Sequence, residues 1–304
     1  MSIVADQITP AKSRRANAAY ESRPIRRIRR SADAMCGINS AIVQVLEEIQ
    51  PATVRQCYYQ LVSRGKIAKT EQEYKTVVRL LGNLRREGFV PFDWIADNTR
   101  WMRKPDSYRG IGHLLRDTAA LYRRDLWQNQ SEYVEIWLEK DALSGVLYDV
   151  TAEYDVPLMV TRGYPSLTFL HASAESIAAE DKPAHLYYFG DFDPSGLDIP
   201  RKVEATIREF APTANIEFER VAVTEAQIRH MALPTRPTKK TDSRSKDFGD
   251  ESVEVDAIPP ATLRAMVEKR ITSHIDQKAL SVLRASEQSE REWLGKLATT
   301  EGAR

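Results

Sequence analysis

The stretch His185-Leu-Tyr-Tyr-Phe-Gly-Asp-Phe-Asp-Pro-Ser-Gly196 passes from a mainly apolar segment directly into two aspartates, a proline and a glycine. Its first part predicts a buried strand over residues 185–189. Asp191 and Asp193 then fall just beyond the end of that strand. Ligands of an open α/β sheet bind beyond the carboxyl ends of its strands. The stretch therefore predicts a strand and, at its end, a ligand site.

Strand and helix patterns alternate on both sides of this stretch. Further strands are expected at 133–138, 157–161 and 216–223. Helices are expected at 141–153, 166–179 and 195–210 and, after a polar loop at 235–250, at 259–275 and 277–297. Strands that alternate with helices predict a parallel, doubly wound α/β sheet. We expect this sheet and the C-terminal helices to form one domain over residues 129–304.

The chain before the sheet has a different pattern. Helices are expected at 32–50, from the N-cap Thr53 onward, and at 71–87, where Gly88 ends the third one. One side of this third helix carries apolar residues, namely Val77, Val78, Leu80, Leu81 and Leu84. The apolar segment 89–101 predicts a small hairpin or wing. Three helices and a wing predict a winged-helix (CAP-like) DNA-binding domain over residues 32–128, preceded by a basic flexible arm at 1–31.

The charge of the chain is divided between its two parts. The total is nearly neutral, with 44 Lys and Arg against 43 Asp and Glu, but residues 1–130 carry a net charge of +10 and the remainder −9. Such asymmetry points to a half that faces nucleic acid. The candidate phosphate contacts are Arg26, Arg27, Arg29, Arg30, Lys75, Arg79, Arg85 and Arg86. Further candidates, for which a solvated loop is an equal alternative, are Arg162, Lys239, Lys240, Arg244 and Lys246.

Composition excludes several classes of protein and site. No apolar run approaches the ~18 residues that span a bilayer, and the N-terminus has no apolar signal region, so we expect a cytoplasmic protein. The two cysteines and five histidines show no metal-ligand spacing. Neither zinc nor a disulfide framework is expected.

Three carboxylates are expected at the carboxyl edge of the sheet. Glu139 follows the strand at 133–138, and Asp191 and Asp193 follow the strand at 185–189. Clustered carboxylates repel one another unless a cation neutralises them, and oxygen ligands without His or Cys favour Mg²⁺, with Mn²⁺ as a substitute. The alternative is that Asp193 caps the helix beginning at Pro194. Capping leaves the pairing with Glu139 unexplained.

Two tyrosines follow each other in the helix Thr53-Val-Arg55-Gln-Cys-Tyr58-Tyr59. Helical spacing predicts that Tyr58 packs in the core and that Tyr59 lies on a polar face beside Arg55. A tyrosine hydroxyl near an arginine and a metal-bound phosphate can act as a nucleophile. Spacing alone favours a surface or DNA-contacting tyrosine.

These segments resemble a known family. Glu139 with Asp191-x-Asp193-x-x-Gly196 resembles the Toprim domain, in which the Glu and the DxD pair bind Mg²⁺. The tyrosine segment resembles the Arg-x-x-Tyr-Tyr segment of the Spo11 and topoisomerase VI A-subunit family, where a winged helix precedes a Toprim domain. The segments Thr161-Arg-Gly-Tyr-Pro-Ser166 and Val253-Glu-Val-Asp-Ala257 resemble two further family segments. The likeness spans roughly residues 35–275.

The resemblance implies an activity. Tyr59 would be the DNA-cleaving nucleophile that forms a 5′-phosphotyrosyl link, and Arg55 would support it. The family works as a homodimer on double-stranded DNA, with the tyrosine of one subunit at the metal site of the other, which gives double-strand breaks. The chain is short and carries no ATPase-like part, so it is most similar to the reduced Mini-A proteins of bacteria and mobile elements. A separate ATPase is a further candidate partner, and a nucleoid-associated location is expected.

The residues themselves leave two alternative functions open. A Toprim nuclease would cut DNA with metal-activated water, and Tyr59 would then only contact DNA. A plasmid or phage maintenance protein would bind DNA without cleavage.

Overall fold

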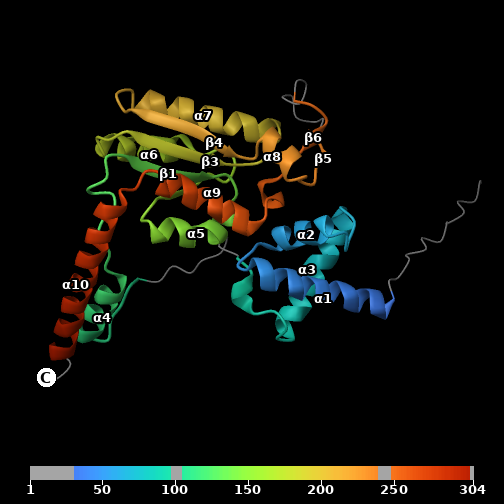
Figure 1. The fold of residues 1–304 in the computed structure, drawn as a ribbon, viewed down its shortest axis with the longest axis horizontal. Coiled ribbons are helices and arrows are strands. Elements are labelled where there is room, and N and C mark those ends of the chain that lie inside the picture. The colour runs from blue at the N-terminus through green and yellow to red at the C-terminus, as the bar shows by residue number, and fades with distance from the viewer. Residues whose placement is uncertain (1–30, 97–104, 239–247, 302–304) are drawn as a thin grey trace, which may run out of the picture.

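The structure is a computed structural model that describes residues 31–96, 105–238 and 248–301. The basic arm, including Arg26, Arg27, Arg29 and Arg30, lies outside these residues. So do Lys239, Lys240, Arg244 and Lys246. The described chain is a mixed α/β structure in which an N-terminal group of helices lies beside a part built on a parallel sheet, with α5 (Ser144–Glu153) and α9 (Pro260–Thr272) between these helices and the sheet (Figure 1).

The N-terminal group consists of α1 (Ala32–Ile49), α2 (Val54–Ser63) and α3 (Glu71–Arg86), close to the predicted bounds. Each helix starts at a hydroxyl cap, and Thr53 forms a capping box with Gln56 that satisfies two backbone N–H groups. Apolar faces of the three helices meet in one core around Ile42, Leu61 and Leu81.

One expectation for this group is wrong, and a second is only partly covered by the described residues. Val78 is 45% exposed, because it lies one residue and about 100° around the helix from the buried Val77. No hairpin follows α3 within residues 89–96, where a 3₁₀ turn (η1, Phe92–Trp94) begins after Pro91. Ile95 instead makes a single parallel bridge to Ala52. The rest of the expected wing, including Trp101, lies outside the described residues.

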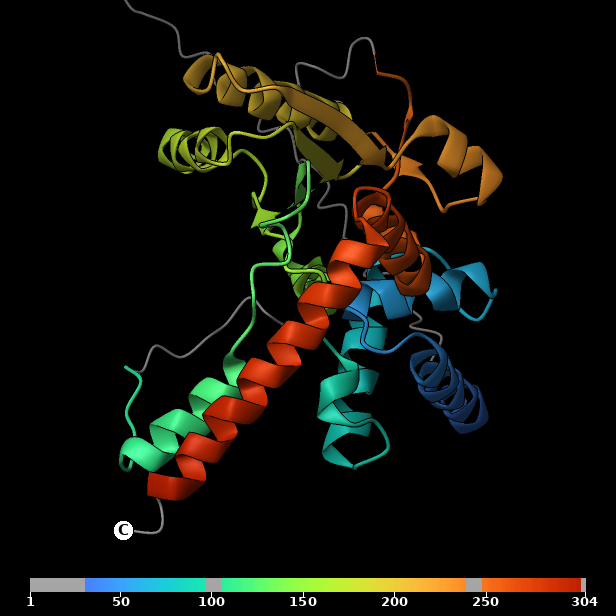
Figure 2. The ribbon, with the colours of Figure 1, turned by 60° about the vertical axis from the view of Figure 1, so that its left-hand side comes forward.

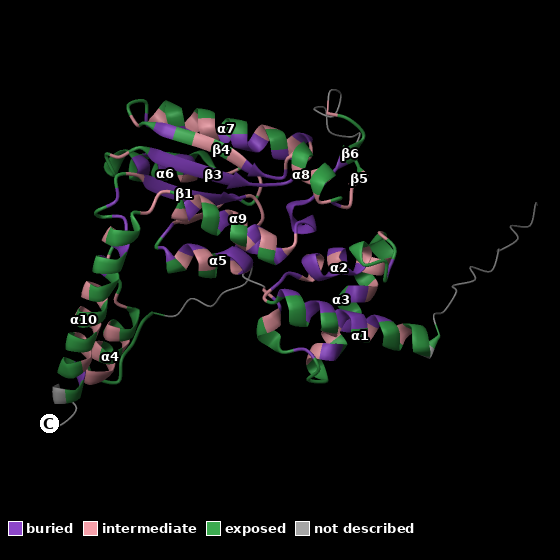
Figure 3. Ribbon diagram, viewed as in Figure 1, coloured by how far each residue is buried: buried purple, intermediate pink, exposed green. Residues whose placement is uncertain are grey.

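The sheet has four strands in the order β2-β1-β3-β4, all parallel. They are β1 (Tyr133–Leu138), β2 (Leu158–Val160), β3 (Ala184–Phe189) and β4 (Ile216–Ala222). Every residue of β1 and β3 is buried, as expected for central strands covered on both faces (Figure 3). The predicted parallel sheet is confirmed.

Helices cover both faces of the sheet. On one face, α6 (Leu167–Ala179) and α7 (Pro194–Phe210) pack on Trp137 and Tyr188. On the other, the 3₁₀ turn η2 (Asp141–Leu143), α5 (Ser144–Glu153) and α9 (Pro260–Thr272) pack on Ile136 and Phe189 (Figure 1). Neighbouring residues of a strand thus point into opposite cores, so β1 and β3 consist mainly of consecutive apolar residues.

The remaining elements lie at the ends of the sheet. The short helix α8 (Glu225–His230) follows β4, and β5 (Arg236–Pro237) pairs with β6 (Glu251–Ser252) ahead of a 3₁₀ turn, η4 (Val255–Ala257). The long α10 (Gln277–Glu301) pairs with α4 (Ile111–Leu121), away from α1–α3 (Figure 2). The sequence did not predict α4. No helix in the described ranges is long and apolar enough to cross a bilayer.

Candidate functional site

The predicted carboxylates meet at the carboxyl edge of the sheet. Glu139 directly follows β1, Asp191 lies two residues beyond β3, and Asp193 is the N-cap of α7. The backbone N–H of Asp191 donates a hydrogen bond of 3.0 Å to Glu139 Oε2. This contact lies just beyond the last parallel pair of β1 and β3, so two segments 52 residues apart in sequence form one site.

Two glycines allow this close approach. A Cβ at Gly190 would lie 2.4 Å from Glu139 Oε2, and one at Gly196 would lie 2.0 Å from the carbonyl oxygen of Asp191. Behind the loop, the Arg220 guanidinium donates to the same Asp191 carbonyl at 2.6 Å. The Gly-Asp-Phe-Asp-Pro-Ser-Gly segment is therefore held with its carboxylates crowded together.

Crowding and burial change the acidity of these groups. Burial, followed by the charges of Asp191 and Asp193, raises the pKa of Glu139 to about 7. Burial also raises the pKa of Asp191. A bound cation would favour the ionised form of both groups, which is the condition expected of a metal site.

Asp193 fulfils the capping alternative as well. Its Oδ1 accepts a hydrogen bond of 2.8 Å from the N–H of Gly196, and its Oδ2 lies 3.3 Å from the Arg236 guanidinium. Capping therefore occupies one carboxylate oxygen, and Arg236 pairs with the other. The two interpretations of this residue are compatible.

The protein supplies its own cation to the site. Lys140 Nζ lies 3.1 Å from Asp191 Oδ1, 3.3 Å from Glu254 Oε2 and 2.7 Å from Asp256 Oδ2. Burial acts against the charge, but the three carboxylates outweigh it and raise the pKa of Lys140. Lys140 was not among the predicted site residues, and its one sequence signal is its position directly after Glu139.

A second group of charges joins the helices to the sheet. Glu254 Oε2 pairs with Arg55 at 2.6 Å, and its Oε1 pairs with Arg236 at 2.8 Å. Burial acts to raise the pKa of Glu254, yet the charges of Lys140 and Arg55 lower it to about 2. Thr53 adds a hydrogen bond of 3.3 Å to Asp256. The start of α2 is thereby attached to η4 beside the carboxylates.

The tyrosine pair differs from its prediction. Tyr58 is in the core as predicted, at 6% exposure, but Tyr59 is also buried, at 4%. Arg55 does lie near Tyr59, and Lys69 Nζ sits 5.3 Å from the centre of its ring. Helical spacing could predict only the face of α2 that packs on the other N-terminal helices. The opposite face is covered by η4, about 200 residues later in the chain.

A cleft of about 750 Å³ lies between the two parts of the chain and opens onto the site. Glu139 and Asp191 line it together with basic side chains, which are Arg55, Arg85, Lys140, Arg162 and Arg236. Lys75, Arg79 and Arg86 are exposed on α3, and Lys75 lies 3.8 Å from Glu71. Of the described candidates for DNA contact, Arg85 and Arg162 are therefore the two at the cleft.

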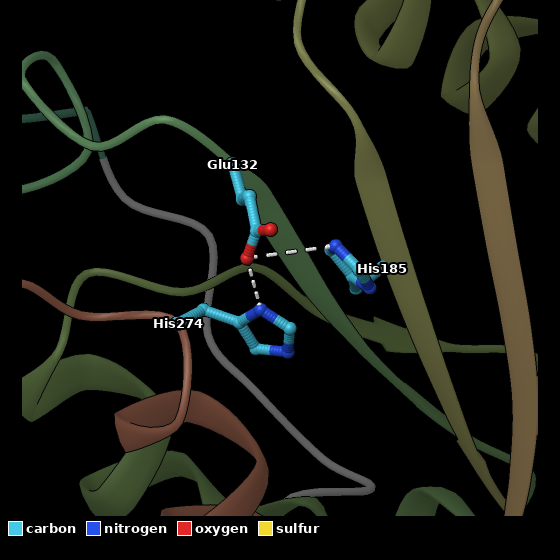
Figure 4. Close-up of side chains that lie close together, drawn as sticks. All are labelled: Glu132, His185 and His274. Atoms are coloured by element: carbon cyan, nitrogen blue, oxygen red, sulfur yellow. Dashed lines mark hydrogen bonds and ion pairs between the residues drawn. The ribbon is translucent and has the colours of Figure 1, made fainter.

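Two histidines come together although their sequence spacing gave no sign of it. Glu132, His185 and His274 lie at the opposite, amino-terminal edge of the sheet (Figure 4). His185 belongs to β3 and His274 follows α9. Sequence spacing could not indicate this group, because pairing of β1 with β3 and the return of α9 bring together residues 89 positions apart.

Comparison with known proteins adds no family, since no protein-family model and no curated protein matches the chain.

Proposed function

We propose that the protein cleaves DNA in a Mg²⁺-dependent reaction at Glu139, Asp191 and Asp193. The observation that carries this proposal is the meeting of Glu139 and Asp191 at one sheet edge, with the charge of Asp193 close enough to act on Glu139, beside a cleft lined with guanidinium groups. Acidic groups bind the metal in such a site, and basic groups bind the phosphate.

The residues present fit magnesium. The donor set is oxygen only. Burial and the charges of Asp191 and Asp193 raise the pKa of Glu139 to about 7, and a bound cation would offset the repulsion between these charges. Glu139, Asp191 and Asp193 would hold the ion, with Lys140 as a neighbouring fixed charge. When bound, the ion would stabilise negative charge on a phosphate and on its leaving oxygen.

The cleft supports a phosphate-containing substrate. Arg162 extends from the loop after β2, with its side chain 62% exposed and one contact of 3.0 Å to Asp141. Arg85 approaches from α3, on the opposite wall. A DNA backbone in the cleft would meet positive charge from both parts of the chain. Such contacts position DNA without reading its sequence.

In this proposal Tyr59 is the nucleophile, within a homodimer that brings it to the metal site of the partner. The charges of Arg55 and Lys140 act to favour its phenolate, although in the structure burial and the charge of Glu254 outweigh them and raise its pKa. Tyr59 packs in the hydrophobic core beside the Tyr58 ring, and polar contacts lie next to it, such as Arg55 with Glu254 and Lys69 with the carbonyl of Pro234 at 2.8 Å. We propose that the phosphates of bound DNA compete for these basic side chains and so release α2.

One observation favours a second candidate, a nuclease that uses metal-activated water. Tyr59 is 4% exposed, and burial, followed by the charge of Glu254, raises its pKa. A neutral, covered hydroxyl is a poor nucleophile. In this case the carboxylates act as proposed and Tyr59 serves the contact between α2 and η4.

Supercoiled plasmid incubated with the protein and Mg²⁺ or Mn²⁺ tests the metal site. We expect cleavage by the wild type, its loss in Asp191→Asn and its retention in Glu175→Gln, a control that removes an exposed carboxylate on α6. Cleavage that survives Asp191→Asn would place the reaction elsewhere. Binding without cleavage in either metal, with or without an added candidate ATPase, would favour a DNA-binding protein.

A further inference from the structure

The cluster of Glu132, His185 and His274 is separate from the carboxylate site. Glu132 immediately precedes β1, and His185 is the second residue of β3. Glu139 and Asp191 lie at the other ends of the same strands. A strand rises about 3.3 Å per residue, so the two sites are roughly 20 Å apart. The metal proposed for DNA cleavage plays no part at this cluster.

Three ligand atoms point toward one another (Figure 4). Glu132 Oε2 contacts His274 Nδ1 and lies 3.6 Å from His185 Nε2. All three atoms lie within 4.8 Å of one another. Ligands at 2.0–2.1 Å from a tetrahedral zinc ion are themselves about 3.3 Å apart. Small side-chain movements would therefore bring the three atoms to coordinating distance.

The far side of each imidazole already has a partner. His185 Nδ1 lies 3.2 Å from Glu217 Oε2, and His274 Nε2 lies 2.6 Å from the Tyr187 hydroxyl. Metal-binding histidines usually hydrogen-bond a carboxylate or another oxygen through the nitrogen that does not bind the metal. These partners leave His185 Nε2 and His274 Nδ1 facing the carboxylate of Glu132.

One of the facing nitrogens lacks a hydrogen bond. His185 Nε2 is buried and has no hydrogen-bond partner, and the His185 side chain is only 10% exposed. An unpaired buried polar atom is unfavourable unless something satisfies it. Glu132, at 35% exposure, leaves the cluster open to solvent on one side. An ion could enter there and keep one water ligand.

We propose that Glu132, His185 and His274 bind a divalent transition metal of the zinc class, with two nitrogens, one carboxylate oxygen and a water molecule as ligands. Imidazole with carboxylate suits zinc and its neighbours rather than magnesium. The ion would connect β1, β3 and the junction between α9 and α10. It would therefore act as a structural link that fixes the start of α10 on the sheet.

The test uses full-length, tag-free protein stripped of metal. Titration with Zn²⁺ against a chromogenic chelator is expected to show one bound equivalent, and Zn²⁺ is expected to raise the thermal midpoint. Co²⁺ in place of Zn²⁺ is expected to give the intense visible absorption of a tetrahedral site. Binding is expected to be lost in His185→Gln and in His274→Gln. It is expected to weaken about 10–100-fold in Glu217→Gln, which removes only an outer partner.

Two matched variants separate this site from others. His171→Gln removes a histidine that is half exposed and paired with Glu175 on α6, and it should keep the bound equivalent. Asp191→Asn alters the carboxylate site and should keep it too. Wild-type protein that binds no Zn²⁺ would overturn the proposal, whatever the variants do. So would binding that persists in folded His185→Gln or disappears in Asp191→Asn. The cluster would then be a hydrogen-bonded network only.

Discussion

Replacing Lys140 with methionine removes the ammonium group that neutralises three carboxylates. At contacts of 2.7–3.3 Å, each pair has a gross attraction of about 5–6 kcal/mol at an effective dielectric constant of ~20. Most of this attraction is offset by the desolvation of the charges. Removing one partner of a buried ion pair nevertheless costs about 3–5 kcal/mol, since the remaining charges stay buried without compensation. We expect Lys140→Met to lose this much stability in the absence of metal.

Urea unfolding in EDTA measures the loss, and unfolding in Mg²⁺ measures its rescue. An ion at the carboxylates would replace part of the missing charge, and at 100 times its dissociation constant it would contribute about 2.7 kcal/mol. Mg²⁺ should therefore stabilise Lys140→Met more than the wild type. Lys75→Met is the control, because Lys75 is 75% exposed and its contact with Glu71 is 3.8 Å long. Its effect should stay within about 0.5 kcal/mol.

A Lys140→Met variant within about 1 kcal/mol of the wild type in EDTA would refute this reasoning. It would mean that the carboxylates are solvated or protonated rather than paired. A loss that Mg²⁺ does not reduce would argue that the ion does not bind beside Asp191.

Three more predictions test other parts of the structure. Gly196→Ala places a Cβ 2.0 Å from a carbonyl oxygen, so it should lower the free energy of unfolding by about 1–3 kcal/mol and reduce both the thermal midpoint and DNA cleavage. Gly37→Ala is the control, because Gly37 lies in open space on α1, and it should be neutral or stabilising. Burial raises the pKa of Glu135 to about 7 from 4.5 when unfolded, so this group should lower wild-type stability by up to about 3 kcal/mol between pH 4.5 and 7. The fall in the urea midpoint should be smaller by that amount in Glu135→Gln, and the remaining fall comes from Glu139, whose pKa is also raised to about 7. Thr53→Ala removes a helix cap and a bond to η4 and should cost about 1–2 kcal/mol in urea unfolding, and an unchanged midpoint would contradict the role of this cap.

The sheet could be predicted because its sequence signals are local. The strand at 133–138 has the predicted bounds, and the other strands differ from prediction by one or two residues. Carboxylates at the ends of parallel strands must meet at one edge, so the contact between Glu139 and Asp191 followed from the order of the elements.

The failures involve partners that are distant in sequence. Tyr59 is buried in a helix that contacts η4, and a helical pattern cannot reveal this contact, since it describes one helix at a time. His185 and His274 meet only because α9 returns along the sheet. Nothing in the sequence distinguishes Lys140 from a surface lysine, because its partner Asp256, 2.7 Å away in the structure, lies 116 residues later in the chain.

The most direct test of the central claim is covalent attachment of the protein to DNA. Reactions with supercoiled DNA and Mg²⁺ are stopped with denaturant, and protein bound to 5′ ends is then measured. We predict attachment by the wild type and by Tyr58→Phe, and none by Tyr59→Phe or Asp191→Asn. Cleavage that continues in Tyr59→Phe, with free 5′ ends, would contradict the tyrosine mechanism and leave metal-activated water as the nucleophile.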